Sequence, residues 1–198
     1  MAEINCLREC GKIHKEIKEN LKTYIKPGMK VIDVVNYIED NIKEKVNYDP
    51  NNHLKSGIGF PTGFSINNCA AHWTPEINDK KIINKEDVIK IDFGIHKDGY
   101  IIDSAYTHYF DDKYENLINS SVEANEKAIK NSGPDAILGE IGKDIQEIIE
   151  SYEIEIENKN YNIIFYKGER VILNETEKSK TEFDKFVYSI ENKEIEDL

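Results

Sequence analysis

Two strand-forming segments that flank a tight turn constrain the fold of this chain more than any other feature. Residues 88–94 and 100–106 are rich in isoleucine and aromatic residues, and the Lys-Asp-Gly sequence at 97–99 between them is typical of a β-hairpin turn. With the turn centred on its Lys-Asp pair, Asp92 lies directly opposite Asp103, with Cβ atoms about 4.5–5.5 Å apart. Two carboxylates this close repel each other unless one is protonated or a cation lies between them. A metal ion is therefore a candidate occupant of this face.

The same register gives the hairpin an apolar second face for burial. It pairs Ile89 with Tyr106, Ile91 with Ser104 and Phe93 with Ile102. A simpler explanation of the two aspartates stays open, because one can belong to the turn and the other can point to solvent, or Lys90 can compensate their charge. The spacing alone does not decide between these explanations.

Five motifs around the hairpin make the metal interpretation more specific. They are Ile-Lys-Pro-Gly-Met at 25–29, Phe-Pro-Thr-Gly at 60–63, Asn-Asn-Cys-Ala-Ala-His at 67–72, Lys-Ile-Asp-Phe-Gly at 90–94 and Ile-Ile-Asp at 101–103. With these motifs the chain resembles the type 2 methionine aminopeptidases of the pita-bread metallopeptidase family, from about Arg8 onward and with the family's intervals kept. The resemblance implies a mixed α+β pita-bread (creatinase/aminopeptidase) fold.

The resemblance also implies a dinuclear metal centre and a pocket for N-terminal methionine. Asp92 and Asp103 match two of its carboxylate ligands, where Asp103 would bridge both ions and Asp92 would chelate one. His72 matches a catalytic histidine that contacts the substrate near the scissile bond, and Phe60 matches a wall of the methionine pocket. The family uses two divalent ions, Co, Mn, Fe or Zn, which can polarise the scissile carbonyl of a peptide that begins with methionine.

The later motifs of the family are incomplete in this sequence. No histidine follows His108, and residues 161–168 resemble the family's flanks joined without the histidine-bearing stretch. Residues 187–191 are similar to the family's Val-Tyr-x-Ile-Glu, which makes Glu191 a candidate third metal ligand. We therefore expect an incomplete fold, with the second half of the sheet truncated, and weak or partial metal occupancy.

The partial match leaves three interpretations open. The chain is a weakly active or inactive methionine aminopeptidase-like protein, or a non-catalytic binding protein on the same fold, like the proliferation-associated relatives. The third interpretation is a gene-model error that removed the histidine and the C-terminal half. The transcript sequence would test it. The intact His72, Asp92 and Asp103 favour descent from the enzymes, and the missing histidine favours the binding role. Whether the chain is an enzyme therefore stays open.

Composition narrows the choice of partners and location. The 198 residues, 39% of them apolar, predict a single domain over 1–198 with a charged, partly mobile tail over 174–198. The net charge of −12 argues against nucleic acid or an anionic membrane as partner, and no apolar run is long enough to span a membrane. Three cysteines without zinc-ligand spacing and no signal peptide favour the cytoplasm. An exposed sheet edge would allow self-association.

Hydrophobic periodicity predicts the remaining elements. Helices are expected over 7–26, 31–44, 114–129 and 141–152, and a second hairpin from residues 153–156 and 161–163.

Four other ring side chains need interpretation. His14 and His96 are expected to be solvated, and His108 is expected on the face of its strand opposite Asp103. Trp73 is expected either to line the substrate cleft, which is the interpretation we favour, or to cap the core.

Overall fold

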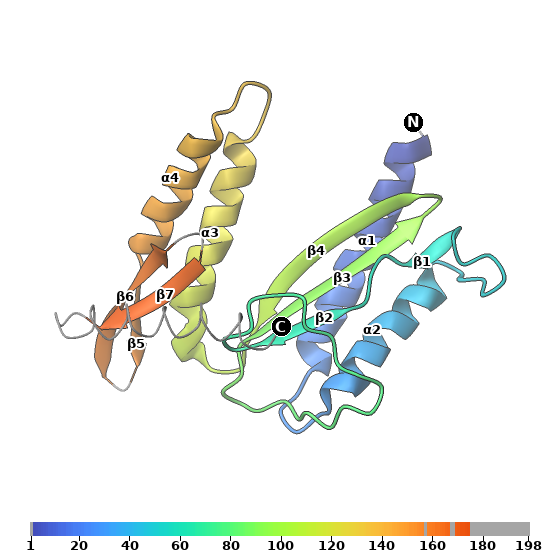
Figure 1. Ribbon diagram of the computed structural model, residues 1–198, viewed down its shortest axis with the longest axis horizontal. Coiled ribbons are helices and arrows are strands. Elements are labelled where there is room, and N and C mark those ends of the chain that lie inside the picture. Colours follow the sequence, from blue (N-terminus) through green and yellow to red (C-terminus); the bar gives the residue numbers. More distant parts are fainter. Residues whose placement is uncertain (1, 157, 167–168, 175–198) are drawn as a thin grey trace, which may run out of the picture. The chain divides into compact units, whose positions relative to one another are not determined.

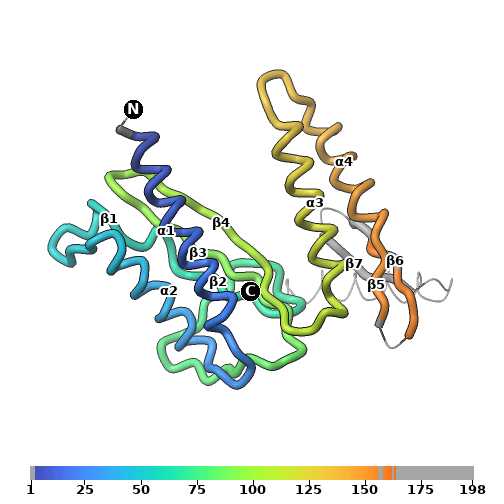
Figure 2. The backbone as a smooth tube through the Cα atoms, turned by 180° about the vertical axis from the view of Figure 1, so that it is seen from behind, coloured from blue at the N-terminus to red at the C-terminus, as the bar shows by residue number. Residues whose placement is uncertain are grey.

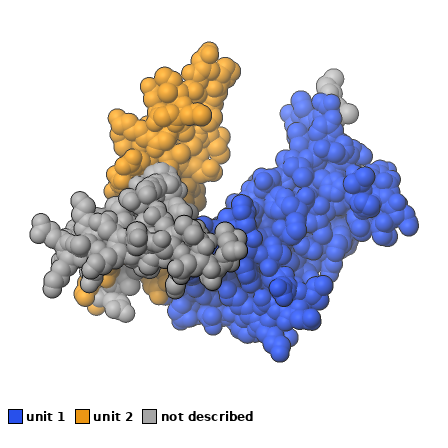
Figure 3. Space-filling view, viewed as in Figure 1, with its two compact units in different colours: residues 1–111 blue, residues 112–198 orange. Residues whose placement is uncertain are grey.

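The structure is a computed structural model that describes residues 2–156, 158–166 and 169–174. The chain divides into two compact units, Met1–Asp111 and Asp112–Leu198, which Figure 3 distinguishes by colour. The expected single domain over 1–198 stays a prediction, and residues 175–198 of the expected charged tail lie outside the described residues.

The first unit packs two helices against a small antiparallel sheet (Figure 1). Its elements are α1 (Ala2–Tyr24), α2 (Val31–Lys45), β1 (Ser56–Ile58), β2 (Gly63–Ile66), β3 (Ile89–Lys97) and β4 (Tyr100–His108). The central strand is β3, which pairs with β4 along one side and with β1 and β2 in succession along the other. The two expected helices and the expected hairpin are confirmed, whereas the short strands β1 and β2 were not predicted.

Alternation along β3 decides which face of the sheet the helices cover. Ile89, Ile91, Phe93 and Ile95 are fully buried, and they belong to the same hydrophobic core as the buried residues of α1 and α2. Side chains two apart on a strand share a face, so Asp92 and Gly94 belong to the other face. The core therefore lies between the helices and one side of the sheet, and the predicted metal-binding side lies opposite.

The register of the hairpin differs from the predicted register by two residues. Lys97 pairs with Tyr100, so that Asp98 and Gly99 form the turn, with φ angles of 51° and 85°. A two-residue Asp-Gly turn with both φ angles positive matches the right-handed twist of the strands, which is why it replaces the expected Lys-Asp turn. The shift puts Asp92 opposite Ala105 instead of Asp103.

The other predicted pairs across the hairpin are wrong for the same reason. The partners are His108 for Ile89, Tyr106 for Ile91 and Ser104 for Phe93. Because side chains alternate with a period of two, a shift of two residues leaves every side chain on its predicted face. Asp92 and Asp103 therefore still share a face, as diagonal neighbours.

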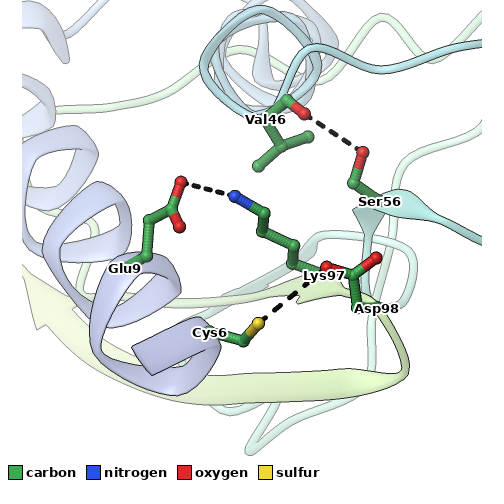
Figure 4. Close-up of polar contacts among 6 residues, drawn as sticks. All are labelled: Cys6, Glu9, Val46, Ser56, Lys97 and Asp98. Carbon is green, nitrogen blue, oxygen red and sulfur yellow. Dashed lines mark hydrogen bonds and ion pairs between the residues drawn. The ribbon is translucent and has the colours of Figure 1, made fainter. Parts of the chain in front are cut away.

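Contacts at the hairpin tip fix it against the rest of the first unit (Figure 4). Lys97 Nζ lies 2.6 Å from Glu9 Oε1 of α1. The amide of Asp98 donates to the Lys55 carbonyl at 2.6 Å, and the thiol of Cys6 lies 3.9 Å from Asp98 Oδ2. The turn is thus held by α1 and by the segment that precedes β1.

His14 is buried, so the prediction that it is solvated is wrong. It is only 5% exposed, and its ring stacks on Phe93 with centroids 3.9 Å apart. His14 shares a helix face with Cys10, Ile17 and Leu21, all of them buried, at intervals of three and four residues. The adjacent charged residues Lys15 and Glu16 are exposed on other faces of α1.

The second unit is a helical hairpin followed by a small sheet. After a short 3₁₀ turn (Asp112–Tyr114), α3 (Glu115–Asn131) and α4 (Leu138–Glu150) lie side by side in both Figure 1 and Figure 2. The strands β5 (Glu153–Ile156), β6 (Lys159–Tyr166) and β7 (Glu169–Asn174) form an antiparallel sheet in that order. Both helices and the β5–β6 hairpin were predicted, and β7 was not. Of the described helices of the whole chain, none is long and apolar enough to cross a membrane.

Candidate metal centre

Four residues singled out in the sequence surround one cavity in the first unit. The cavity has a volume of about 380 Å³ and is lined by Phe60, Pro61, Gly63, His72, Thr74, Asp92 and Asp103. The other sequence candidate, Glu191, lies outside the described residues.

Asp92 is the most perturbed group of the cavity. Its Oδ1 atom is buried and has no hydrogen-bond partner among the described residues. Burial raises the pKa of Asp92, and the negative charge of Asp103 and a hydrogen bond with Asp103 raise it further. The nearby His72 and His14 oppose this effect only in part. A carboxylate in such a place gains from a cation beside it.

Gly59 and Gly94 allow Phe60 to lie directly on the sheet, and Gly63 leaves room beside Asp92. The amide of Gly59 donates to the Gly94 carbonyl at 2.7 Å. A Cβ atom added to Gly94 would overlap the ring of Phe60, and one added to Gly63 would lie 3.3 Å from Asp92 Cβ. Since Gly94 pairs with Asp103, the Phe60 ring lies beside the carboxylates and forms an apolar wall of the cavity.

His72 reaches the rim of the cavity from a constrained loop. It has a φ of 64°, in the left-handed region that residues other than glycine rarely occupy. The chain just after it is fixed, because the Trp73 carbonyl accepts from the Phe64 amide at 2.7 Å and Thr74 Oγ1 donates to the Thr62 carbonyl at 3.1 Å. Backbone strain of this kind persists where surrounding contacts over-determine it, and it clusters at functional sites.

Trp73 packs against the core of the first unit and is not among the residues that line the cavity. The favoured expectation that it lines the cleft is therefore wrong, and the core-capping alternative holds. Lys81 lies over the face of its indole ring, with Nζ 4.6 Å from the ring centroid.

The two later histidines lie on opposite faces of the hairpin. His108 is buried against the core side, with Nε2 unpartnered among the described residues and its ring edge-on to Phe110, so its predicted face is confirmed. His96 is not a solvated loop residue, because it lies within β3 and is half-buried.

The donors around the cavity fit a divalent cation in type but are few in number. Carboxylate oxygens are hard donors that suit Mn and related ions, and the unpartnered Asp92 Oδ1 is free to coordinate. However, the described residues contain no group of three or more His, Cys, Asp or Glu side chains that could hold a metal ion. Among the described residues, Asp92 and Asp103 are therefore the two carboxylates that line this cavity.

Comparison with known proteins assigns the family. The model of Metallopeptidase family M24 matches residues 5–182. The chain belongs to this family. Its fold is accordingly the mixed helix-and-strand pita-bread fold of these metallopeptidases, in partial form, and the predicted fold class is confirmed.

Named relatives and solved structures agree with this assignment. Methionine aminopeptidase 2 of Schizosaccharomyces pombe is 46% identical over 161 residues, which are 81% of this chain and 37% of that protein. Methionine aminopeptidase 2 of Candida dubliniensis is 48% identical over 159 residues, 79% of this chain and 34% of that protein. The crystal structure of methionine aminopeptidase from Rickettsia prowazekii matches with a TM-score of 0.63 and 23% identity over 88% of this chain and 73% of that chain. The chain thus spans little more than a third of the curated relatives it matches.

Proposed function

We propose that the cavity of the first unit binds a divalent metal ion and the N-terminal methionine of a peptide, and that this chain takes part in removing that methionine. The observation that carries the proposal is the pair Asp92 and Asp103 on one face of β3 and β4, with a buried Asp92 oxygen that lacks a hydrogen-bond partner. Similarity to proteins named methionine aminopeptidase 2 supports the choice of substrate.

Each residue of the cavity has a role in this proposal. Asp92 and Asp103 would hold the metal ion, together with Glu191 or other groups outside the described residues. The ion, when bound, would polarise the scissile carbonyl. Phe60 would bury the methionine side chain, and His72, which is exposed at the rim, would form a hydrogen bond to the peptide near the scissile bond.

We further propose that metal binding is weak and that activity is low. Two carboxylates provide less negative charge and fewer ligand atoms than a tightly bound Co, Mn, Fe or Zn ion requires. Low occupancy of the metal site then limits turnover. Without the metal ion, no Lewis acid polarises the scissile carbonyl of a bound peptide.

A non-catalytic binding role is the second candidate. The absence of a third metal-ligating side chain near Asp92 and Asp103 among the described residues favours it. In this role Phe60 and His72 would still bind a peptide. Self-association remains a further prediction, since no described strand pairs with the outer edge of β4. A cytoplasmic location also stays a prediction.

Calorimetry with Mn²⁺ tests the metal proposal. We expect weak binding by the full chain and none by Asp103→Asn, because that variant keeps the shape of the side chain but loses a charged donor. Asp98→Asn is the matched control, since it removes the same charge from the tip of the same hairpin. Equal loss in both variants would show that Mn²⁺ binds to general negative charge and not to the cavity.

A Met-Ala-Ser peptide distinguishes the enzyme from the binding protein. Slow release of methionine in the presence of Mn²⁺, lost in both Asp92→Ala and Asp103→Ala, would support the aminopeptidase. Peptide binding without any release, weakened in Phe60→Ala, would support the binding role. If the peptide is neither cleaved nor bound, both the aminopeptidase role and the binding role are excluded.

A further inference from the structure

His14 joins α1 to the two strands that carry the aspartates. Its Nε2 atom lies 3.0 Å from the carbonyl oxygen of Phe93 on β3 and 3.1 Å from the carbonyl oxygen of Ser104 on β4. Both contacts are within hydrogen-bond distance, and the side chain is almost fully buried. One imidazole therefore binds both strands of the hairpin at the same level.

Along the hairpin, the residue pair that His14 contacts lies between the pairs that contain the two aspartates. Phe93 and Ser104 are partners in the β3–β4 register, and the adjacent pairs are Asp92 with Ala105 and Gly94 with Asp103. The carbonyls that His14 contacts therefore belong to the residues that directly follow Asp92 and Asp103.

The chemistry of the contact determines the state of the ring. Carbonyl oxygens only accept hydrogen bonds, so Nε2 must carry the hydrogen and donate to both oxygens. Stacking on Phe93, with 9° between the ring planes, restricts rotation of the imidazole. Burial lowers the pKa of His14, which keeps the ring neutral at physiological pH.

We propose that His14 is a positioning residue for the cation site, and that its bifurcated hydrogen bond sets the separation of Asp92 and Asp103. The inference rests on the proposed function, because it takes the two aspartates as the cation site. Two ligands on neighbouring strands converge on one ion only if the strands keep a fixed spacing at that level. His14 provides such a constraint from the helix side, without touching the ion or the substrate.

Three variants test the proposal with Mn²⁺ as the probe. His14→Leu keeps an apolar side chain of similar length but has no donor, and it should weaken Mn²⁺ binding about 10- to 100-fold, as loss of outer-shell partners does. His14→Gln places an amide N–H near the position of Nε2 and should restore most of the affinity. Ile17→Ala is the control on the same buried face of α1, and it should lower thermal stability while leaving the affinity of the folded protein unchanged.

Equal Mn²⁺ affinity in His14→Leu and the unchanged chain would overturn the proposal. So would an equal loss in His14→Leu, His14→Gln and Ile17→Ala, because that pattern reports general destabilisation. If His14→Leu does not fold, His14→Asn replaces it. Its amide is one methylene shorter than that of glutamine, so it should fail to reach the carbonyls and lose affinity where His14→Gln does not.

Amide hydrogen exchange without metal separates this proposal from the proposed function. Exchange at residues 92–94 and 103–105 should become faster in His14→Leu and stay slow in His14→Gln. If the unchanged chain binds no Mn²⁺, the proposed function fails. The exchange result still decides whether His14 holds β3 and β4 together. Unchanged exchange in His14→Leu would overturn the positioning role even if Mn²⁺ binds.

Discussion

Among the residues that the structure describes, the two units bury very different numbers of apolar side chains. The first unit has a continuous core to which α1, α2, β2 and β3 all contribute. In the second unit the buried cluster of the described residues consists of Ala124, Ile149, Ile154 and Ile163. Large apolar side chains are exposed in both units, for example Leu54 and Ile77 in the first and Ile129 and Leu138 in the second.

All the costly features of the candidate site lie in the unit with the larger core. Asp92 has a buried, unpartnered oxygen, and His72 has a left-handed backbone conformation. Each such feature lowers stability, and surrounding packing has to offset it. The comparison therefore indicates that the first unit can maintain a strained site because its core is large.

Core truncation should give the largest effect and a clear difference between the units. Phe64→Ala should lower the free energy of unfolding by about 3–5 kcal/mol, whereas Ile154→Ala should cost about 2 kcal/mol, since a small cluster relaxes more easily. Trp73 is the only tryptophan and packs on the first core, so its fluorescence follows that unit in urea. An equal shift of the Trp73 transition in Ile154→Ala would show that the units unfold as one and would remove the distinction between them.

Removing the buried charge should give a smaller effect of opposite sign. The pKa of Asp92 is raised in the folded state, so its contribution to stability is present at low pH and is lost as the pH rises through the folded-state pKa. Without metal at pH 7, Asp92→Asn should therefore raise the free energy of unfolding, by about 0.5–2 kcal/mol. At pH 4 the gain should shrink, which urea unfolding of both proteins at the two pH values measures. A loss of stability in Asp92→Asn at pH 7 would contradict the idea of a strained site.

The sequence predicted the sheet face on which Asp92 and Asp103 lie more reliably than the residue that pairs with each of them across the hairpin. Alternation of apolar residues in β3 determines the buried face, and an error of two residues in the register does not change it. The register itself depended on the turn, where the preference of Asp98 and Gly99 for positive φ angles outweighed the Lys-Asp alternative. That preference was present in the sequence.

Other features depended on tertiary contacts that no local pattern encodes. The strands β1 and β2 have three and four residues, too few for a periodic signal, and they form because β3 offers an edge to each. The apolar periodicity of residues 7–26 predicted α1, but not that His14 would be buried there and would contact two strand carbonyls. Phe60 and His72 were found by family resemblance, since neither lies in a pattern that predicts a cavity.

Ion pairs should give the smallest effects, and they compare the two units directly. Lys97 and Glu9 join the hairpin tip to α1 at 2.6 Å, whereas Lys143 and Glu147 lie 3.4 Å apart within α4 and are more exposed. We expect a coupling energy near 1 kcal/mol for the first pair and about 0.3–0.5 kcal/mol for the second. Double-mutant cycles with glutamine at each position, measured by urea unfolding, provide both values. High salt should reduce the α4 coupling more, because its charges are better solvated. Equal couplings would mean that the ion pair between the hairpin tip and α1 stabilises the first unit no more than an exposed pair within one helix does.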